Sequence, residues 1–407
     1  MRVFYTIGIW FYTLGIRLAA LFGHSKARLM VKGWAKGNNI RKSEGGTAWF
    51  HAASLGEFEQ ARPVLEEYKH RHPDCRIVVT FFSPSGYEVR KNYPTADVVL
   101  YLPPDLPSHV KRFLDTYRPT VAFFVKYEFW FNYLTELHRR GIPTYIFSAI
   151  FRPSQYFFKP WGYWFRKELK DCFNHLFVQN KESLELLRSI GIGHCSVAGD
   201  TRFDRVHQIA LAAENNDTVE QFLEGHHGKV LVCGSTWPPD EELIHQLSVT
   251  GDELRMIIAP HVISEEHLKQ IEALFPDSVR YSKLASGTHT TNQVLIIDNI
   301  GLLSKLYRYA DVAYIGGGFG VGIHNILEAV TFGKPVLFGP NHQKFQEAKD
   351  IIACGGGFSH SDQTSLERHL KPLLTDAEAY RRASQACLDY MNANLGSTEK
   401  ILSTIEH

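Results

Sequence analysis

Apolar residues occur in short β-rich runs separated by stretches with helical spacing, beginning at Ala48. This alternation is typical of parallel sheets with helices on both faces. The first series of predicted strands comprises residues 49–53, 76–82, 98–102, 121–126, 144–149, 175–179 and 195–198. The second series comprises residues 229–233, 255–259, 294–298, 312–315 and 335–338. Helices are expected between the strands, for example at residues 241–247 and 300–309, and again from Asp376 onward.

A polar stretch, residues 200–228, interrupts this alternation and is interpreted as a linker or hinge. A chain of 407 residues exceeds what one hydrophobic core usually fills, so two domains are expected. The predicted fold is α/β, with two doubly wound, Rossmann-like domains. The expected parts are an anchoring segment (1–43), a first domain (44–210), a linker (211–228), a second domain (229–385) and a helix packing back toward the first domain (386–407).

The N-terminal segment combines an apolar run with basic charge. Residues 3–16 are uncharged and aromatic-rich, and eight basic residues precede Glu44, the first acidic residue, in a chain whose net charge is only +1. They are Arg2, Arg17, Lys26, Arg28, Lys32, Lys36, Arg41 and Lys42. The run is short for a bilayer span of ~20 residues, and we expect a helix lying at an anionic membrane surface. A buried helix capping the first domain and a signal peptide are the alternatives.

Neither cysteines nor histidines suggest a metal site. The six cysteines are scattered without a C-x-x-C pair, which fits a reducing cytosol. No D-x-D motif follows a predicted strand, and the histidines show no H-x-x-x-H or H-E-x-x-H spacing. We therefore expect no metal and no cofactor.

Two glutamates that follow predicted strands are candidates for acid–base chemistry. Glu57 comes three residues after Ser54, in the first turn of a predicted helix, and Glu128 follows strand 121–126. Ligands of open α/β sheets bind at the carboxyl ends of the strands, so both carboxylates are expected in one crevice. Glu57 is the candidate general base for deprotonating a sugar hydroxyl. The alternatives are a capping box of Ser54 and Glu57, and a surface position for Glu128 beside Trp130.

The second predicted domain carries glycine-rich turns after its strands. Residues 234–236 (Gly-Ser-Thr) follow one strand, and residues 316–322 (Gly-Gly-Gly-Phe-Gly-Val-Gly) follow a later one. Free backbone N–H groups at such turns bind phosphate, and a helix is expected to open at the second turn. That helix would place His324, Asn325 and Glu328 near one face, with the carboxylate available to ribose hydroxyls. Ordinary turn chemistry and a glycine-rich hinge are the alternatives.

These motifs, taken in order, resemble the 3-deoxy-D-manno-octulosonic acid (Kdo) transferases of Gram-negative bacteria, over nearly the whole chain. The resemblance rests on residues 51–57 (His-Ala-Ala-Ser-Leu-Gly-Glu), 127–130 (Tyr-Glu-Phe-Trp), 199–204 (Gly-Asp-Thr-Arg-Phe-Asp), 234–236, the glycine-rich segment through Glu328, and 338–340 (Phe-Gly-Pro). It implies a GT-B fold, with two domains facing each other across a cleft, and an inverting transfer of Kdo from CMP-Kdo to the lipid A precursor, lipid IVA. It also implies metal-independent chemistry in lipopolysaccharide biosynthesis, at the cytoplasmic face of the inner membrane.

The resemblance assigns roles to individual residues: Glu57 matches the family's general base and Glu128 a second essential carboxylate. The motifs and the resemblance together give the expected donor-binding residues Ser54, Gly56, Arg202, Gly234, Ser235, Thr236, Pro260, His261, Gly317, Gly318, Gly320, His324, Asn325 and Glu328. The residues expected at the acceptor or the membrane are Trp10, Phe11, Lys126, Trp130 and Arg152. The chain departs from the family's usual residues at 148–152, at 260–262, where His261 replaces an arginine, and at 320–324.

Aromatic residues are concentrated between residues 145 and 167, interleaved with Arg152, Lys159, Arg166 and Lys167. Such a belt suits an interface that holds acyl chains and phosphates together. Packing in the core is the alternative, because aromatic side chains are mostly buried wherever they occur.

Two other functions are compatible with the pattern. One is a GT-B transferase that uses a UDP-sugar, which stronger inhibition by UDP than by CMP would indicate. The other is a non-catalytic, membrane-tethered protein that binds nucleotide sugars, which donor binding without CMP release would indicate. Nucleic-acid binding is disfavoured, because basic and aromatic residues coincide only at the N-terminus and in the aromatic belt.

Overall fold

The computed structural model describes residues 1–35, 46–247, 254–285 and 292–406. The chain forms two compact units: unit 1 comprises Met1–Arg205 and Leu395–His407, and unit 2 comprises Val206–Asn394. The chain therefore passes between the units after residue 205 and again after residue 394, compared with the expected domain ends at 210 and 385.

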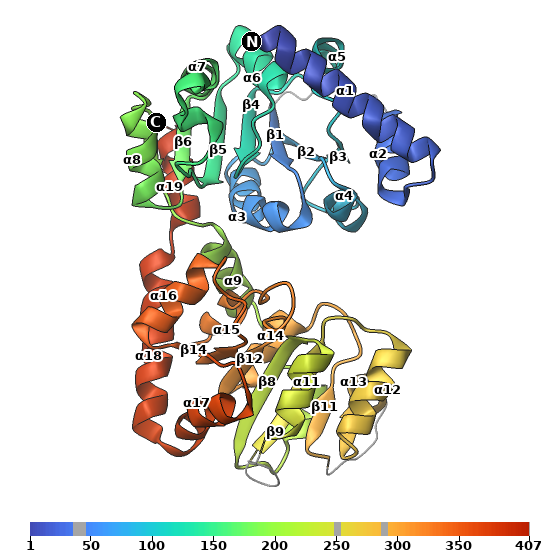
Figure 1. The fold of residues 1–407 in the computed structure, drawn as a ribbon, viewed down its shortest axis with the longest axis vertical. Coiled ribbons are helices and arrows are strands. Elements are labelled where there is room, and N and C mark those ends of the chain that lie inside the picture. The colour runs from blue at the N-terminus through green and yellow to red at the C-terminus, as the bar shows by residue number, and fades with distance from the viewer. Residues whose placement is uncertain (36–45, 248–253, 286–291, 407) are drawn as a thin grey trace. The chain divides into compact units, whose positions relative to one another are not determined.

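Unit 1 contains a seven-stranded parallel sheet in the order β3-β2-β1-β4-β5-β6-β7 (Figure 1). Its strands are β1 (Thr47–Ala52), β2 (Arg76–Phe81), β3 (Val98–Tyr101), β4 (Val121–Val125), β5 (Thr144–Ala149), β6 (His175–Val178) and β7 (Cys195–Val197). Its helices are α1 (Arg2–Leu21), α2 (Ser25–Ala35), α3 (Leu55–Arg71), α4 (Pro84–Arg90), α5 (Pro107–Tyr117), α6 (Phe131–Arg139), η1 (Tyr156–Phe158), η2 (Pro160–Gly162), α7 (Tyr163–Cys172), α8 (Lys181–Ser189) and α19 (Ser397–Glu406). All seven strands predicted for the first series are confirmed.

The two faces of this sheet bury different side chains, because successive residues of a strand point to opposite faces. Phe50 of β1 packs in the same core cluster as Phe58 of α3, whereas Trp49 packs with Phe113 of α5. Helices α3 and α5 therefore cover opposite faces, as Figure 1 shows. His51 shares the face of Trp49.

Helix α1 is apolar and largely exposed. It spans twenty residues, and Trp10 and Phe11 are 52% and 61% exposed. Its first turn is held on unit 1 by the Tyr5 hydroxyl, which donates to the buried Asp105 carboxylate at 2.7 Å. By length and composition α1 could cross a membrane, a test that some soluble helices and signal sequences also pass. The helix extends beyond the uncharged run of residues 3–16 at both ends, so the expectation that this segment is too short to span a bilayer is wrong. The exposure of its side chains contradicts the alternative of a buried helix that caps the first domain.

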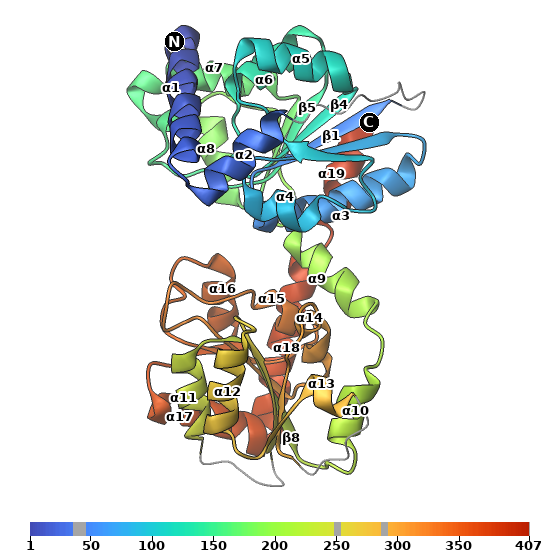
Figure 2. The same cartoon turned by 90° about the vertical axis from the view of Figure 1, so that its right-hand side faces the viewer.

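Helix α2 directly follows α1 (Figure 2) and contacts the edge strand β3. Of the N-terminal basic residues, Lys26, Arg28 and Lys32 lie on α2, while Lys36, Arg41 and Lys42 fall outside the described residues. Gly33 of α2 faces the Tyr101 ring so closely that a Cβ there would lie 2.0 Å from it. Only glycine allows α2 this close to the strand.

Unit 2 repeats the plan with the strand order β10-β11-β9-β8-β12-β13-β14. Its strands are β8 (Lys229–Thr236), β9 (Leu254–Pro260), β10 (Ser278–Arg280), β11 (Val294–Ile296), β12 (Val312–Ile315), β13 (Val336–Phe338) and β14 (Gly357–Ser359). Its helices are α10 (Asp217–Leu223), α11 (Pro238–His245), α12 (Glu265–Leu274), α13 (Tyr281–Leu284), α14 (Leu303–Leu306), η4 (Tyr307–Tyr309), α15 (Leu327–Val330), α16 (Gln346–Cys354), α17 (Gln363–Thr375) and α18 (Ala377–Asn394), and α9 (Arg202–Leu211) begins in unit 1. All pairings are parallel, so each unit is a doubly wound α/β sheet.

The structure corrects the sequence-based elements of unit 2 in three places. Strands β10 and β14 were not predicted, because each has a single apolar residue among its three and so shows no apolar run. The stretch 200–228, interpreted as a linker, contains α9 and α10; α10 is capped by Asn216, whose side chain accepts from Val219 N. The single helix expected at 300–309 is divided into α14 and η4.

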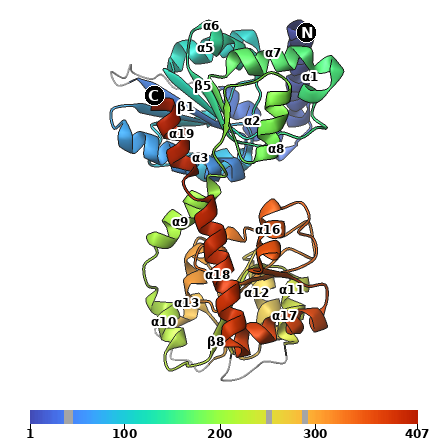
Figure 3. The same cartoon turned by 90° about the vertical axis from the view of Figure 1, so that its left-hand side faces the viewer.

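Unit 1 is completed by α19, which packs against α3 (Figure 3). The buried Asp204 carboxylate accepts hydrogen bonds from Gly396 N at 2.8 Å, from Thr398 N at 2.6 Å and from Thr398 Oγ1 at 2.7 Å. These bonds satisfy free N–H groups at the start of α19. Ile401 and Leu402 then join the core cluster on the α3 face.

We expect Asp204→Ala to destabilise unit 1 by about 1–3 kcal/mol, because it leaves buried N–H groups without acceptors. Urea unfolding measures the loss, and hydrogen exchange should show faster exchange in α19. Asp376→Ala is the matched control, because Asp376 accepts from Glu378 N and Ala379 N at an exposed helix start in unit 2. Equal losses in the two variants would contradict the prediction.

Candidate active site

Two carboxylates lie at the point where the first sheet reverses its strand order. Glu57 is in the first turn of α3, directly after β1, and Glu128 is in the turn after β4. Strands β1 and β4 are adjacent and parallel, so their carboxyl ends meet at one edge of the sheet. The negative charge of Glu128 acts on Glu57 strongly enough to raise its pKa. The structure thus brings the two candidate catalytic residues together.

Glu57 is partly buried, and the backbone holds its carboxylate. Its Oε2 accepts from Ala53 N at 2.6 Å, and its own N–H approaches Ser54 Oγ at 3.5 Å. The capping arrangement is therefore half formed, because the carboxylate binds Ala53 rather than the N–H of Ser54. Burial, followed by the charge of Glu128, raises the pKa of Glu57 to about 7. Such a carboxyl is partly ionised at neutral pH and suits a general base.

Glu128 is held by two ring nitrogens. Its Oε2 accepts from Trp130 Nε1 at 2.7 Å and lies 3.0 Å from His51 Nε2. His51 is fully buried, and its Nδ1 lies 2.8 Å from Thr80 Oγ1, the residue paired with it across β1 and β2. A plain surface position for Glu128 is excluded by these contacts. Sequence reasoning did not find the roles of His51 and Thr80, which only the strand register makes visible.

Three residues expected at the acceptor lie in or against the turn after β4, residues 126–130. Lys126 adopts a left-handed conformation, with φ 58°, between β4 and Glu128, and its charge lowers the pKa of Glu57. The Trp130 ring lies 5.1 Å from the Phe82 ring. The Arg152 guanidinium lies 5.9 Å from the centre of the Tyr127 ring.

Most of the aromatic belt belongs to the core. Phe147, Phe151 and Phe157 are buried, and most of the other rings pack against them. Trp161 and Tyr163 are the exceptions, at 61% and 69% exposed. The core-packing alternative therefore accounts for most of the belt.

The segment 199–204 has a structural function in unit 1. The Arg202 guanidinium lies 2.7 Å from Asp200 Oδ2, and Asp200 Oδ1 accepts from Gln60 Nε2 at 2.9 Å. Burial opposes ionisation of Asp200, but Arg202 and these hydrogen bonds hold its pKa below the ordinary value. The Thr201 hydroxyl donates to Gln60 O at 2.6 Å. Arg202, expected at the donor, is thus anchored beside α3.

In unit 2 the glycine-rich loop is longer than expected and its helix is shorter. Gly317 and Gly322 have φ values of 89° and 139°, which fold the loop back on itself, and α15 contains only four residues. His324 therefore lies in the loop, not on a helical face with Asn325 and Glu328. That part of the sequence prediction is wrong, because the loop uses the residues that were assigned to the first helical turn.

Asn325 and Glu328 remain together. Asn325 Oδ1 accepts from Leu327 N at 3.2 Å, and its Nδ2 donates to Glu328 Oε1 at 3.1 Å. Asn325 thus accepts from the first N–H of α15 and orients the carboxylate.

The turn 234–236 forms the end of β8 and is mostly buried. The Thr236 hydroxyl donates to Glu241 Oε1 at 2.8 Å and is inaccessible, so it is not a phosphate donor as expected. Gly234 lies under Tyr307, whose Oη would be 1.9 Å from a Cβ at this position. Ser235 is partly exposed and has φ 54°. Of the three expected residues, only Ser235 presents its side chain.

A buried carboxylate that sequence reasoning missed holds the glycine-rich loop. Asp240 Oδ2 accepts from Gly317 N at 2.9 Å and from Trp237 N at 3.0 Å, and Oδ1 accepts from Tyr314 Oη at 3.0 Å. Burial raises the pKa of Asp240. The sequence signal was an acidic residue at the third position of α11, which by itself suggests only an ordinary helix cap.

Three flat side chains stack beside this loop. The His261 ring lies 4.4 Å from the His324 ring and 4.8 Å from the Trp237 ring, with interplanar angles of 28° and 25°. Burial, together with the charge of His261, lowers the pKa of His324 to about 4. His261 directly follows Pro260, the last residue of β9. The structure thus brings together His261 and His324, which sequence reasoning assigned to the donor.

A cavity of about 380 Å³ opens between the loops after β12 and β13. It is lined by Gly320, Val321, Asn341, Gln343 and Lys344. The loops touch at Gly318 and Gly339, where a Cβ on either residue would lie within 3.0 Å of the other loop. Backbone and amide groups with one lysine give this cavity the chemistry of an anion site.

Among the described residues, no three His, Cys, Asp or Glu side chains gather in a way that could hold a metal ion. The six cysteines are free thiols.

Comparison with known proteins gives consistent matches. Residues 24–205 match the family described as 3-deoxy-D-manno-octulosonic-acid transferase (kdotransferase). The chain is 27% identical over 337 residues to the enzyme of that name from Aquifex aeolicus, covering 81% of this chain and 86% of the relative. It is 28% identical over 398 residues to the one from Chlamydia pneumoniae, covering 93% and 89%.

Solved structures show the same architecture. A UDP-GlcNAc 2-epimerase from Neisseria meningitidis superposes with a TM-score of 0.62 at 18% identity, covering 88% of this chain and 99% of that one. This likeness concerns the fold alone, which is of the GT-B class. The family match and the sequence matches over most of the chain indicate a glycosyltransferase that is similar to the Kdo transferases.

Proposed function

We propose that this chain transfers Kdo from CMP-Kdo to lipid IVA in lipopolysaccharide core biosynthesis, with inversion at the anomeric carbon and Glu57 as general base. The observation that carries the proposal is the pairing of Glu57 with Glu128 at the strand-order reversal of unit 1. One carboxyl has its pKa raised to about 7, and the other is held by two ring nitrogens. This combination suits a base beside a fixed charge.

The proposed reaction is a single displacement. The oxygen of the acceptor hydroxyl forms a bond to the anomeric carbon of Kdo while its proton passes to Glu57. The bond from that carbon to the CMP phosphate breaks, and its electron pair leaves on the phosphate oxygen. Glu128 raises the proton affinity of Glu57 and orients hydroxyl groups.

On the donor side we propose unit 2 as the CMP-Kdo site. The glycine-rich loop held by Asp240, the His261–His324 stack and the partly exposed Ser235 offer N–H groups, rings and a hydroxyl to a nucleoside phosphate. We propose that no divalent metal takes part, since a single donor phosphate carries less charge to neutralise than a diphosphate.

We propose that α1 and the basic residues of α2 hold the enzyme at the cytoplasmic face of the inner membrane. The support is the exposure of the apolar residues of α1 and the cations that follow it. Tyr5 fixes the start of α1 on unit 1, an arrangement that suits a helix lying on the bilayer better than one crossing it.

Glu57→Gln is expected to reduce turnover about 10²–10⁴-fold, the usual contribution of a general base, while leaving CMP binding intact. The same variant should be about 1–3 kcal/mol more stable than the native chain at pH 8, because burial raises the pKa of Glu57 and penalises its charged form. Glu67→Gln, farther along α3 and paired with Arg71, is the control and should retain activity. Near-native turnover of Glu57→Gln would reduce Glu57 to a helix cap.

The pH profile of kcat/KM should fall on the acid side with an apparent pKa of about 7, because Glu57 must be deprotonated to act as a base. In the residual activity of Glu128→Gln, this acid limb should move to lower pH, since one charge that raises the pKa of Glu57 is gone. A limb near the ordinary value of ~4.3 in the native enzyme would contradict the assignment.

The donor, the acceptor and the metal requirement are checked in one assay. We expect mass spectrometry to detect Kdo-modified product from CMP-Kdo and lipid IVA in detergent with excess EDTA, and CMP to inhibit more strongly than UDP. Product that appears only with added Mg²⁺ would refute metal independence. Stronger inhibition by UDP would favour a UDP-sugar donor.

A further inference from the structure

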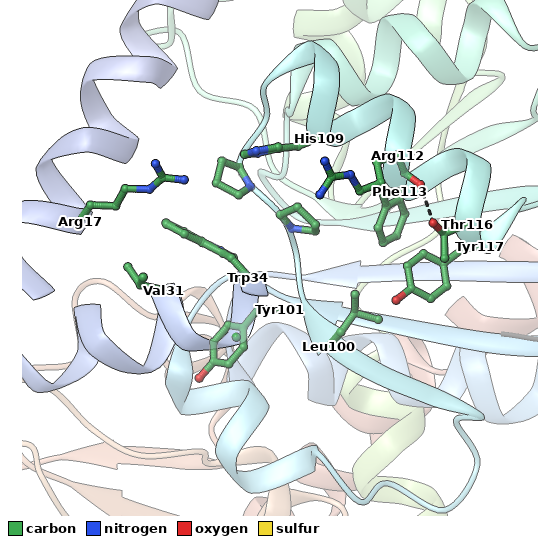
Figure 4. A pocket seen from close by; sticks show the side chains of 13 residues that line it. Arg17, Val31, Trp34, Leu100, Tyr101, His109, Arg112, Phe113, Thr116 and Tyr117 are labelled. Atoms are coloured by element: carbon green, nitrogen blue, oxygen red, sulfur yellow. Dashed lines mark hydrogen bonds between the residues drawn. The ribbon is translucent and has the colours of Figure 1, made fainter. Parts of the chain in front are cut away.

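A pocket of about 460 Å³ lies in unit 1 between α1, α2, the end of β3 and α5 (Figure 4). Its volume is within the range of ~300–1,000 Å³ that is typical of small-molecule sites. Figure 4 shows Arg17 reaching in from α1, Arg112 and His109 standing on α5, and Trp34 between them in this view. The proposed reaction uses none of these residues.

The charged side chains that line the pocket are all basic. They are Arg17, Arg112 and His109, and the described residues of the lining include no aspartate or glutamate. Burial lowers the pKa of His109, and the charges of Arg112 and Arg17 lower it further. Both guanidiniums therefore act on the same small volume. A pair of this kind fits a phosphate, which accepts hydrogen bonds from guanidinium groups in a fixed geometry.

The rest of the lining is apolar or aromatic. Trp34, Tyr101, Phe113 and Leu100 face a single cavity. One polar ring atom of the wall, Trp34 Nε1, is buried without a hydrogen-bond partner among the described residues. Buried polar atoms of this kind are uncommon and call for an acceptor or donor from outside the chain. The occupant must combine an anionic group with an apolar part.

The position of the pocket separates it from the candidate active site. It opens at the edge strand β3, two strands away from β1, on the face covered by α5. Glu57 lies in the first turn of α3, which covers the opposite face. The pocket also adjoins α1, the helix whose apolar side chains are exposed. It therefore lies where unit 1 would meet a bilayer.

We propose that this pocket binds the head group of one anionic membrane phospholipid. Arg17 and Arg112 contact the phosphodiester, and Trp34 and Phe113 contact the glycerol and the first methylenes of the acyl chains. A bound lipid would join α1 to α5 and so set the orientation of unit 1 at the membrane. The inference rests on the membrane association included in the proposed function and adds a specific lipid site to it.

The test compares two double variants of the full chain with the same change in charge. Arg17→Gln/Arg112→Gln removes the pocket cations, and Lys26→Gln/Lys32→Gln removes two cations of α2 that do not line the pocket. Binding is measured by flotation with vesicles of phosphatidylcholine, alone or mixed with phosphatidylglycerol. We expect the pocket variant to lose at least about tenfold more affinity for the anionic vesicles than the control variant, because it loses hydrogen bonds as well as charge.

A third variant leaves the charge unchanged. Thr116 is exposed on α5 and lines the pocket, so Thr116→Trp should fill the cavity without disturbing the core. It should abolish the one-to-one binding of short-chain phosphatidylglycerol, measured by native mass spectrometry. Equal losses in the two double variants, or unchanged lipid binding by Thr116→Trp, would overturn the proposal.

Competition distinguishes the sources of phosphate. If inorganic phosphate displaces phosphatidylglycerol at equal concentration, the pocket is a site for free anions. If the chain binds lipid IVA but not phosphatidylglycerol in this pocket, the pocket is part of the acceptor site. Either result overturns the proposal. Kdo transfer in detergent micelles should be unaffected in the pocket variants. A native chain that binds phosphatidylglycerol but shows no transfer would sink the proposed function and leave this inference standing.

Discussion

The reversal of strand order between neighbouring parallel strands positions the chemistry of this chain. In unit 1 the reversal lies between β1 and β4, and in unit 2 between β8 and β12. On either side of such a point the connecting helices lie on opposite faces of the sheet, so the strand ends are left uncovered. Glu57 and Glu128 follow one pair of strands. At the other pair, Ser235 lies at the end of β8 and Gly316 directly follows β12. The hydrogen bonds to Glu128 within unit 1, and the one between Asp240 and Gly317, hold polar groups in place at these strand ends.

Placing groups at these strand ends costs conformational free energy at several residues. Lys126, Ser148 and Ser235 are non-glycine residues with φ between 52° and 58°, and each lies at or next to the carboxyl end of a central strand. A left-handed conformation costs such residues roughly 1–2 kcal/mol. Two carboxylates beside each other add electrostatic repulsion. His51 and Trp130 relieve it at Glu128, and the Ala53 N–H, His51 and Lys126 offset part of it at Glu57. The buried sheet supports this strain, while burial and the charge of Glu128 raise the pKa of Glu57 to about 7.

The repeating layers were predictable from sequence, and much of the site was not. Buried parallel strands such as 121–125 form apolar runs that can be recognised in the sequence, and all twelve predicted strands are present. Strands β10 and β14 each contain a single apolar residue and carry no such signal. The glutamates were found because they directly follow strands. The role of His51 depends on its register with Thr80, and that of Asp240 on a loop 77 residues away, so neither was visible in a local pattern. Thr236 was misjudged because its hydroxyl donates to Glu241 in the interior.

The attachment of α19 to Asp204 also means that unit 1 cannot complete its fold until the last residues of the chain have been synthesised. Helix α19 belongs to unit 1, yet the ribosome produces it only after the whole of unit 2. At ~5–20 residues per second, the synthesis of unit 2 delays it by roughly 10–40 seconds. During that time the nascent unit 1 already contains both glutamates, but its α3 face is open to solvent where Ile401 and Leu402 will pack. Chaperone binding or premature release would therefore act first on the unit that carries the candidate general base.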